Sequence, residues 1–376
     1  MSVSYIPYST RFILWGKAAG KCQYRGCNKS LFVDVLTKAE FNSSYIAHIV
    51  ADVEDGPRGD KIRSPKLCKS LSNLMLMCDV HHRRIDKDDV NGHPESLLLE
   101  MKEEHEGRIE KVTDIKHDMQ SHIVVYKSNV GIHTPVVTYE SVREHILPDY
   151  YPAMSSAIDL SLSNSTQKDS DPDFWKSEVK NLDDQFGEQL RPKLRKSEIK
   201  HLSLFAIAPM PLLIKLGTML NDIQSMTVNQ LSRSPKTWKL SDDKKRIKYI
   251  INKPAIIHTK VALNISLSGT ITNDRIEAIL GNDCSIYTLT IKIPMNDFLK
   301  NKVHLADFSL AIRQLFDEIK SVHGGNAQLN VFPAMPVATS VEFGRVWMPK
   351  VDMPMVIYDQ NSLLGGFIKA IEITNP

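Results

Sequence analysis

The residues best suited to metal chemistry lie in the first 82 positions, where cysteines and histidines form two closely spaced pairs. Cys22-x4-Cys27 and Cys78-x2-His81 each offer two ligands from one short turn. Two such turns complete the tetrahedral shell that Zn²⁺ prefers, and Cys68 is a competing fourth ligand. With all four positions filled by protein, the predicted zinc ion is structural and has no open position for a substrate.

A second set of polar residues lies between and beside these pairs. His48 occurs in YIAHIV, Asn73 occurs in LSNLML, and His82 follows His81 directly. His48 is followed by Asn73, and eight residues separate Asn73 from His82. Together with the zinc-ligand spacing, this order resembles the HNH, or ββα-metal, nuclease family over about residues 20–90. The resemblance implies a zinc-stabilised α+β domain that hydrolyses phosphodiesters.

The resemblance also implies roles for these residues. His48 is the general base, since a neutral imidazole with a pKa of about 6.5 accepts a proton from water. His82 is a protein ligand of one Mg²⁺, which stabilises charge on the phosphate and on the leaving oxygen. Asn73 either coordinates that ion or holds the turn that orients His48.

One position departs from the family pattern. Many members place Asp or His directly before the general base as a metal ligand, and this chain has Ala47 there. The metal shell is therefore completed by water and phosphate oxygens, or by Asp52, Glu54 or Asp55 from the following loop.

Charge is concentrated locally. The whole chain has 47 Lys and Arg against 44 Asp and Glu, which leaves a net charge of only +3. Residues 58–87 contain eight basic and three acidic residues. Basic side chains beside a nuclease site position a DNA duplex through its phosphates. We predict phosphate contacts for Arg58, Arg83 and Arg84, and we interpret the lysines of this segment as solvated.

The helical and loop segments outside these motifs are simpler. An amphipathic helix is predicted from Pro94 to about Asp118, with an inward face composed of Leu97, Leu98, Leu99, Met101, Ile109 and Val112. Residues 161–173 are nearly free of apolar side chains and predict a loop. Residues 174–200 predict a charged helix or helix pair, interrupted at Pro192.

Beyond residue 118 a pattern occurs twice. A strand at Leu202–Ala208 leads into Pro209-Met210-Pro211 and a helix that reaches Gly217. A strand at Gln328–Phe332 leads into Pro333-Ala-Met335-Pro336 and a helix that reaches Gly344. Upstream strands at His122–Tyr126 and Val261–Ile265 each lead into a Ser/Gly loop. The repeat predicts two related α/β halves, at about 119–257 and 258–376.

Ligands of open α/β sheets bind beyond the carboxyl ends of the strands, where backbone N–H groups attract anions. The Ser/Gly loops and the Met-Pro turns occupy that position in both halves. Two facing halves would form one pocket for a phosphate-bearing ligand with approximate two-fold symmetry. The alternative is that Gly269 and the prolines only shape tight turns.

The motifs LFAIAPMPLLIKLG at 204–217, VFPAMP at 331–336 and EFGR at 342–345 resemble the SAVED domain, a fusion of two CARF-like Rossmannoid units. Together with the HNH-like segment, they make the chain similar to effector nucleases of bacterial CBASS anti-phage systems. The resemblance implies a bacterial cytoplasmic protein with an HNH domain at 1–118 and a SAVED sensor at 119–376.

It further implies a cyclic di- or trinucleotide ligand made by a partner CD-NTase, a dimer or higher homo-oligomer on activation, and cleavage of double-stranded DNA with little sequence preference. Trp238 or Tyr358 would stack on a base, although an indole is more often part of a core, and Arg345 or Lys127 would meet a phosphate. The other predicted ligand residues lie in the loops and turns: Ser128, Pro209, Met210, Ser266, Ser268, Gly269, Pro333 and Met335.

Length and composition agree with this organisation. A chain of 376 residues predicts two or three domains. Its five cysteines are too few, and odd in number, for a disulfide scaffold, which favours an intracellular protein. The most apolar window, 202–220, contains two prolines and a lysine, so no membrane span is predicted. Two rival functions are a modification-dependent HNH restriction endonuclease and a non-catalytic, zinc-stabilised DNA-binding regulator.

Overall fold

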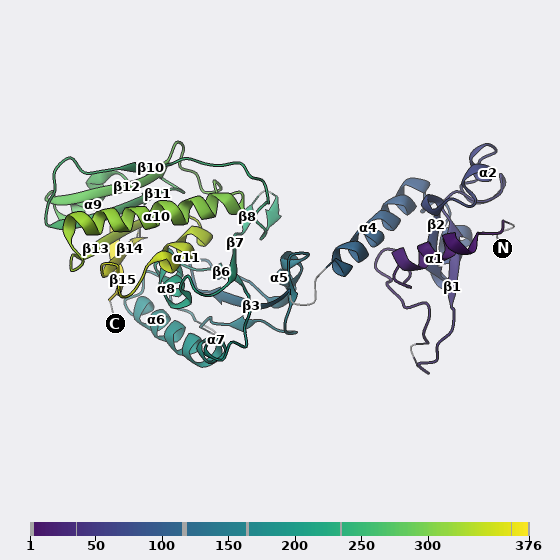
Figure 1. Ribbon diagram of the computed structural model, residues 1–376, viewed down its shortest axis with the longest axis horizontal. Helices are drawn as coiled ribbons and strands as arrows, with labels where there is room; N and C mark the ends of the chain where they lie inside the picture. Colours follow the sequence, from purple (N-terminus) through teal and green to yellow (C-terminus); the bar gives the residue numbers. More distant parts are fainter. Residues whose placement is uncertain are drawn as a thin grey trace. The chain divides into compact units, whose positions relative to one another are not determined.

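The structure is a computed structural model that describes residues 4–34, 36–114, 119–162, 165–233, 235–361 and 363–374. The chain divides into two compact units, residues 1–116 and 117–376 (Figure 1). The predicted boundary after residue 118 lies two residues from this division, and residue 118 itself lies outside the described residues.

The N-terminal unit is a small α+β domain. Its elements are α1 (Tyr8–Lys17), β1 (Ser44–His48), α2 (Arg63–Leu67), a 3₁₀ turn (Leu71–Asn73), β2 (Leu74–Cys78), α3 (Asp79–Arg83), a π turn (Arg84–Asp88) and α4 (Glu95–Thr113). The two strands pair antiparallel, with His48 opposite Leu74 and Ser44 opposite Cys78. Since α3 begins directly after β2 and contacts both strands, the three elements form a ββα unit.

The core of this unit is small and is centred on β2. All five β2 side chains are buried, together with Leu14 of α1 and Leu98 of α4. The inward face of α4 differs from the prediction, because Leu99 and Val112 are 41% and 48% exposed. The buried α4 positions are Leu98, Met101, Lys102 and His105. They follow one helical stripe, which turns the adjacent Leu99 towards solvent.

The first half of the C-terminal unit is a five-stranded parallel sheet. Its strands are β3 (Gln120–Lys127), β4 (Tyr151–Pro152), β5 (Ile158–Asp159), β6 (Leu202–Ile207) and β7 (Met226–Asn229). The order is β4-β3-β6-β7, with β5 also paired to β3. The accompanying elements are α5 (Tyr139–Val142), a 3₁₀ helix (Arg143–Ile146), α6 (Phe174–Gln185), a π turn (Phe186–Leu190), α7 (Arg191–Arg195), α8 (Met210–Leu220) and the hairpin strands β8 (Ser232–Arg233) and β9 (Lys236–Thr237).

The second half is a six-stranded sheet in the order β10-β12-β11-β13-β14-β15. Its elements are β10 (Tyr249–Asn252), β11 (Lys260–Ser266), α9 (Asn273–Leu280), β12 (Cys284–Ile291), α10 (Lys302–His323), β13 (Leu329–Ala334), α11 (Val337–Val346), β14 (Met355–Asn361) and β15 (Gly366–Ile373). The four inner strands are parallel and the two edge strands are antiparallel. Helices α8, α10 and α11 contribute to one apolar core that both sheets share (Figure 1).

The predicted repeat is present in the structure. In each half an early strand pairs in parallel with a later strand that leads into a helix: β3 with β6 and α8, and β11 with β13 and α11. One predicted turn residue is misplaced, because Pro333 lies inside β13 opposite Ile265. The true counterparts are Pro209 and Pro336, each of which directly precedes the first residue of its helix.

Helices α8 and α11 meet at two equivalent glycines. A Cβ on Gly217 would lie 2.1 Å from the carbonyl oxygen of Val341, and a Cβ on Gly344 would lie 2.0 Å from that of Ile214. Each carbonyl belongs to the residue three positions before the opposite glycine. The contact is therefore reciprocal, as expected for two copies of one unit packed about a pseudo-two-fold axis.

Replacing Gly344 with Ala is expected to destabilise the C-terminal unit by about 1–3 kcal/mol or more, because both clashing groups are backbone. Urea unfolding followed by circular dichroism measures the loss. Gly187→Ala is the matched control, since nothing lies within 4 Å of its Cβ position and alanine favours a helix. Equal stability of the two variants would contradict the tight helix contact.

Among the described residues, no helix combines the length and the apolar character needed to cross a membrane.

Candidate functional site

The four predicted zinc ligands come together in the N-terminal unit. The ligand atoms of Cys22, Cys27, Cys78 and His81 all lie within 4.8 Å of one another. Nδ1 of His81 is 3.2 Å from Sγ of Cys78 and 3.7 Å from Sγ of Cys22. Donors on a tetrahedral zinc ion are roughly 3.5–3.8 Å apart, given its usual bond lengths. The residues therefore fit Zn²⁺ in both chemistry and spacing.

Local structure places each ligand. Cys27 follows Gly26, whose left-handed φ of 80° closes the first turn, while Cys78 ends β2 and His81 lies in α3. Cys68 is not part of the cluster, because its thiol donates to the carbonyl oxygen of Pro65 at 3.3 Å. The geometry thus selects His81, and not Cys68, as the fourth ligand.

The surroundings of the cluster set the protonation and the orientation of its ligands. Burial raises the pKa of Cys22 to about 12, so without a cation this thiol stays protonated, and metal binding must displace the proton. Burial lowers the pKa of His81, which keeps its imidazole in the neutral form that binds metals. The ring of Tyr24 stacks on His81 at 4.0 Å, and its hydroxyl bonds Nε2 of His93 at 2.9 Å, which fixes the imidazole.

His48 is the last residue of β1 and is 7% exposed. Its Nε2 lies 2.9 Å from the carbonyl oxygen of Cys68. Because a carbonyl oxygen only accepts hydrogen bonds, Nε2 carries a proton, so in the neutral ring the lone pair is on Nδ1. This is the tautomer that a general base requires, with a fixed ring orientation.

Asn73 serves the backbone and not a metal ion. Its Oδ1 accepts a bond from the N–H of Val50 at 2.8 Å, and its Nδ2 donates to the Val50 carbonyl at 2.8 Å. The residue is 4% exposed. Of the two predicted roles, the structure favours holding the turn after β1, and coordination of Mg²⁺ by Asn73 stays a prediction.

His82 has a carboxylate neighbour that the sequence analysis missed. Its Nε2 lies 3.3 Å from Oδ2 of Asp86, which follows four residues later, and its ring stacks on Tyr45 at 4.9 Å. An imidazole and a carboxylate at this distance suit a divalent cation. The prediction names Asp52, Glu54 or Asp55 as the carboxylate that accompanies His82, and it does not consider Asp86. The spacing of four residues along a helix was the available signal.

The prediction of Arg58 as a DNA contact is wrong, because its side chain is only 8% exposed. Nε donates to the carbonyl oxygen of Ile49 at 2.6 Å, Nη1 donates to that of Ile85 at 2.8 Å, and Nη2 bonds Asp86 at 2.8 Å. Arg58 therefore ties the residue after His48 to the carboxylate beside His82. It acts inside the domain as a cross-link between the two parts of the site.

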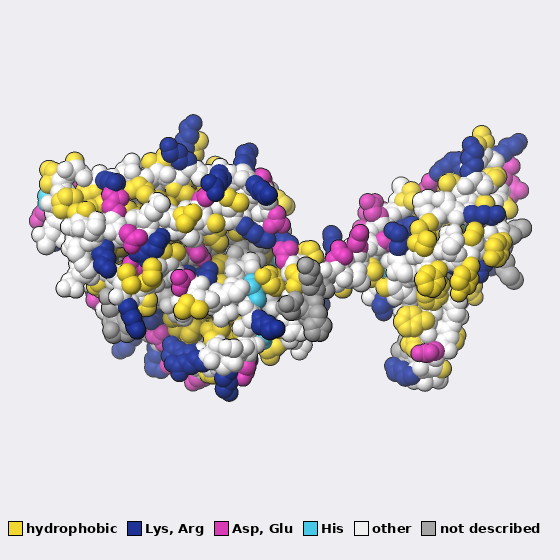
Figure 2. Space-filling model, viewed as in Figure 1, with side chains coloured by type: hydrophobic (Ala, Val, Ile, Leu, Met, Phe, Trp, Pro, Cys, Tyr) yellow, Lys and Arg dark blue, Asp and Glu magenta, His cyan; other side chains and the backbone are white. Residues whose placement is uncertain are grey.

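Exposed basic residues remain near this site. Arg83 has a side chain that is 64% exposed, and the exposed Arg84 lies over the Tyr24 ring at 6.0 Å. Figure 2 shows Lys and Arg side chains gathered around α2. The exposed lysines of this segment are Lys61, Lys66, Lys69 and Lys87. The surface suits phosphate contacts, and DNA binding by Arg83 and Arg84 stays a prediction.

In the C-terminal unit the two predicted Met-Pro turns meet. The N–H of Met335 lies 3.3 Å from Sδ of Met210, which joins the turn of one half to that of the other. Pro209 caps α8 directly before Met210. In the Ser/Gly loops, Gly269 has open space at its Cβ position. The structure therefore brings the Met-Pro turns of both halves together, and ligand binding at these turns stays a prediction.

Other predicted ligand residues serve local structure. Oγ of Ser266 accepts a bond from the N–H of Ile271 and donates to Asn264. The N–H of Ser268 donates to the carbonyl oxygen of Ala334, while Ser128 is buried. The Lys127 ammonium pairs with Asp159 at 2.7 Å, with 31% of the side chain exposed. Of these four residues, only Lys127 has a charged group that can reach a ligand.

Two aromatic predictions are wrong. Trp238 is 7% exposed and packs edge-on against Phe205 at 5.4 Å. Tyr358 is 8% exposed and stacks on Phe332 at 4.4 Å. Both rings belong to the apolar layers outside the sheets, so neither is free to stack on a base.

Arg345 is also committed within the fold. Nε donates to the carbonyl oxygen of Asn221 at 3.0 Å, Nη2 donates to that of Gln224 at 3.1 Å, and Nη1 pairs with Glu342 at 2.8 Å. Its side chain is 12% exposed. The predicted phosphate contact is therefore wrong, since the guanidinium is held by two carbonyl oxygens of the segment after α8 and by Glu342 of its own helix.

A family model matches residues 182–373; it describes SAVED, the SMODS-associated and fused to various effectors sensor domain. No curated protein matches the chain significantly. Solved structures of the Cap4 SAVED/CARF-domain containing receptor of Acinetobacter baumannii with 2′3′3′-cAAA and with 3′3′3′-cAAA are 14% and 13% identical, with TM-scores of 0.44 and 0.43. The Moraxella osloensis Cap4 receptor is 12% identical, with a TM-score of 0.42.

Each alignment covers 74% of this chain, but 55%, 62% and 60% of the three solved chains. The chain thus spans less than two thirds of the length of these receptors.

Proposed function

Because the chain belongs to the family of SAVED sensor domains, we propose that it is a cyclic-oligonucleotide-activated DNA endonuclease of the CBASS type. The C-terminal unit binds a cyclic di- or trinucleotide made by a partner CD-NTase in the bacterial cytoplasm. The N-terminal unit is an HNH-type nuclease that cleaves double-stranded DNA with little sequence preference.

The observation that carries the nuclease half is the arrangement of His48 and His82 on one ββα unit beside a four-ligand cluster. The ring of His48 is oriented by the carbonyl oxygen of Cys68, and His82 and Asp86 present a ligand pair. Arg58 bonds both Asp86 and the carbonyl next to His48. A zinc-stabilised domain that only binds DNA needs neither a general base nor a pair of metal ligands.

In the proposed mechanism, Nδ1 of His48 takes a proton from the attacking water. The carbonyl oxygen of Cys68 holds the ring in the required tautomer, and Asn73 holds the turn beside it. His82 and Asp86 would hold Mg²⁺, which supplies positive charge to the scissile phosphate and to the leaving oxygen. Arg83 and Arg84 contact neighbouring phosphates and set the position of the duplex.

The sensing half rests on family membership and on the paired architecture. The strand-end turns of the two halves meet at Met210 and Met335, so one ligand there contacts both halves. To switch the population from 1:99 to 99:1, the ligand must bind the active arrangement more tightly by about 5.5 kcal/mol. We propose that assembly into a dimer or higher homo-oligomer supplies part of this difference through mass action.

Calorimetric titration of the full chain with a panel of cyclic di- and trinucleotides tests the sensor. We expect saturable binding of at least one member, and gel filtration with that member should show a larger assembly. Failure of the whole panel to bind would contradict the sensing role, and binding with an unchanged mass would contradict activation by assembly.

A further inference from the structure

Six buried polar atoms that have no hydrogen-bond partner gather at one place in the first half of the C-terminal unit. They are both carboxylate oxygens of Glu178, the hydroxyls of Tyr126, Ser128 and Ser165, and the indole Nε1 of Trp175. Only nine side-chain atoms of this kind occur among all the described residues, so most of them belong to this cluster. Native proteins contain few such atoms, and each calls for a partner such as water or an ion.

Three segments of the chain bring these groups together. Tyr126 lies in β3, Ser128 follows the end of that strand, and Glu178 lies on α6. Ser165 belongs to the loop before α6, and the side chain of Asn129 donates to its carbonyl oxygen at 3.2 Å. Burial raises the pKa of Glu178, and the nearby hydroxyls of Ser128 and Ser165 oppose this rise. Burial, and then the charge of Glu178, raises the pKa of Tyr126. All three hydroxyls therefore lie close to the carboxyl group.

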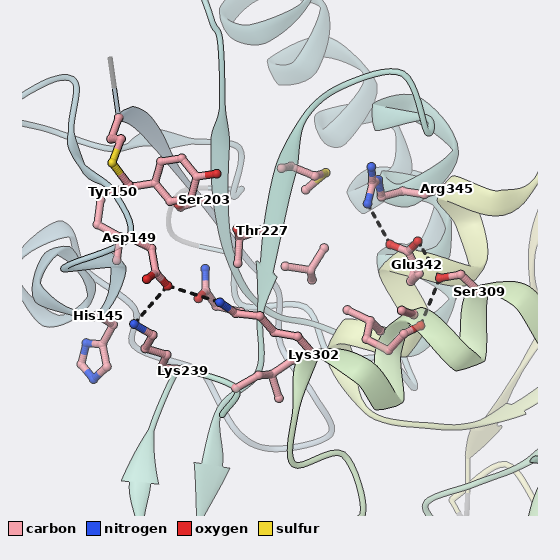
Figure 3. Close-up of a pocket in the computed structure, with 18 residues that line it drawn as sticks. His145, Asp149, Tyr150, Ser203, Thr227, Lys239, Lys302, Ser309, Glu342 and Arg345 are labelled. Atoms are coloured by element: carbon pink, nitrogen blue, oxygen red, sulfur yellow. Dashed lines mark hydrogen bonds and ion pairs between the residues drawn. The ribbon is translucent and has the colours of Figure 1, made fainter. Parts of the chain in front are cut away.

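The carboxyl group of Glu178 is completely buried and has no positively charged partner among the described residues. The cavity shown in Figure 3 is different, because Lys239 and Lys302 both bond Asp149 there. Lys302 also bonds Asp242 at 2.8 Å. Buried charges in proteins are paired or coordinate a metal ion. Glu178 therefore lacks the positive charge that a buried carboxylate needs.

The groups around Glu178 suit one alkali-metal cation, Na⁺ or K⁺. Hard cations take oxygen ligands, and the cluster offers two carboxylate and three hydroxyl oxygens. One carboxylate balances one positive charge, whereas a divalent ion would leave a net charge buried. The indole N–H of Trp175 only donates, so it is not a ligand. Ser165 also lines a surface pocket between its loop and α6, which gives the ion a route to the cluster.

We propose that Glu178, Tyr126, Ser128 and Ser165 bind a single Na⁺ or K⁺ ion. The ion joins β3, the loop before α6 and α6 itself, so it stabilises the first half of the C-terminal unit by linkage. It also fixes Ser128 at the start of the Ser/Gly loop. This site is separate from the metal sites of the N-terminal unit and goes beyond the proposed function.

Melting of the full chain in sodium, potassium and N-methylglucamine chloride at equal ionic strength is the test. Tryptophan fluorescence follows the C-terminal unit, which contains three of the four tryptophans. A site that is about nine-tenths filled raises the ratio of folded to unfolded protein about tenfold, which raises the melting temperature by about 3–6 °C. We expect this rise with Na⁺, K⁺ or both, relative to N-methylglucamine, which is too large for a buried site.

Glu178→Gln should abolish the difference among the three salts, because the amide keeps the shape of the side chain and removes its charge. In N-methylglucamine chloride this variant should melt no lower than the unchanged protein, since a buried charge without a partner is lost. The matched control is Glu188→Gln, which removes an exposed carboxylate from the π turn after α6. It should keep the full dependence on the salt.

Ser165→Ala provides a second variant in a loop, where a change is less of a risk to folding. It should raise the ion concentration needed for half of the effect about two- to tenfold, the loss expected for one neutral ligand. A crystal grown with rubidium chloride should show an anomalous-scattering peak beside Glu178.

Equal melting temperatures of the unchanged protein in all three salts would overturn the proposal, and a water molecule or a proton would then be the partner of Glu178. The same salt dependence in Glu178→Gln as in Glu188→Gln would also overturn it. If Glu178→Gln does not fold, Ser165→Ala and the rubidium peak decide. An unchanged ion requirement in Ser165→Ala, or water in place of the peak, contradicts the site.

Discussion

Replacing His48 with Ala is expected to lower the rate of plasmid cleavage by about 10²–10⁴-fold, the usual contribution of a general base. The fold should survive, because the lost contact is a single bond to the carbonyl oxygen of Cys68. Affinity for the cyclic oligonucleotide should also survive, since the ligand belongs to the other unit. Initial rates on supercoiled plasmid, measured with Mg²⁺ and saturating ligand, give the ratio.

Cys68→Ser is the matched control for this variant. It keeps the backbone carbonyl that orients His48 and changes only a thiol that bonds Pro65. Its cleavage rate should stay within a few-fold of the unchanged protein, as estimated for a site without a direct catalytic role. If His48→Ala cleaves as fast as Cys68→Ser, His48 is not the general base. The N-terminal unit would then be better explained as a DNA-binding domain.

We propose that the Cys22, Cys27, Cys78 and His81 cluster holds a structural zinc ion, and its removal is expected to unfold the N-terminal unit and to leave the C-terminal unit folded. Structural zinc contributes about 10–16 kcal/mol in small zinc-finger peptides, which exceeds the whole stability of many domains. The apolar core of this unit is small, and two cluster ligands, Cys22 and Cys78, belong to it. The ββα unit should therefore lose its shape when the ion leaves.

Cys78→Ser is the sharpest version of this test. Elemental analysis should fall from one zinc per chain to nearly none, and limited proteolysis should degrade the N-terminal unit while a fragment of the C-terminal unit persists. Cys68→Ser should keep its zinc, because its sulfur lies outside the cluster. Full zinc content in Cys78→Ser, or a protease-resistant N-terminal unit without metal, would contradict a structural role for the ion.

The four-ligand cluster and the repeat could be predicted because short spacings carry the information. Cys22 and Cys27 lie in one turn, and Cys78 and His81 lie at one strand-to-helix junction. Each pair is therefore close in space because its members are close in sequence. The matching sequences before α8 and α11 identified two copies of one unit. Their contact through Gly217 and Gly344 needed the three-dimensional structure.

Residues whose roles depend on burial were not predictable in the same way. Arg58 has the charge of a DNA contact, but the turn after β1 folds it onto the carbonyls of Ile49 and Ile85. Trp238 has the shape of a stacking platform, but it fills an apolar layer beside Phe205. In both cases the residue type suggested a surface role, and the tertiary packing that no local pattern encodes placed the side chain inside.

Asp86 was missed for a related reason. The absence of Asp or His at position 47 suggested carboxylates in the next loop, whereas Asp86 lies beside His82, four residues later in the chain. The structure also links this carboxylate through Arg58 to the end of β1. The proposed metal ligands therefore depend on a contact between segments that are 28 residues apart.

The most direct test of the whole account is the dependence of plasmid cleavage on the cyclic oligonucleotide. The zinc-loaded chain is incubated with unmodified supercoiled plasmid and Mg²⁺, with and without the panel member that binds. Little cleavage is expected without ligand, and rapid linearisation and degradation are expected with it, independent of plasmid sequence and modification. Equal cleavage with and without ligand, or cleavage of modified plasmid alone, would contradict it.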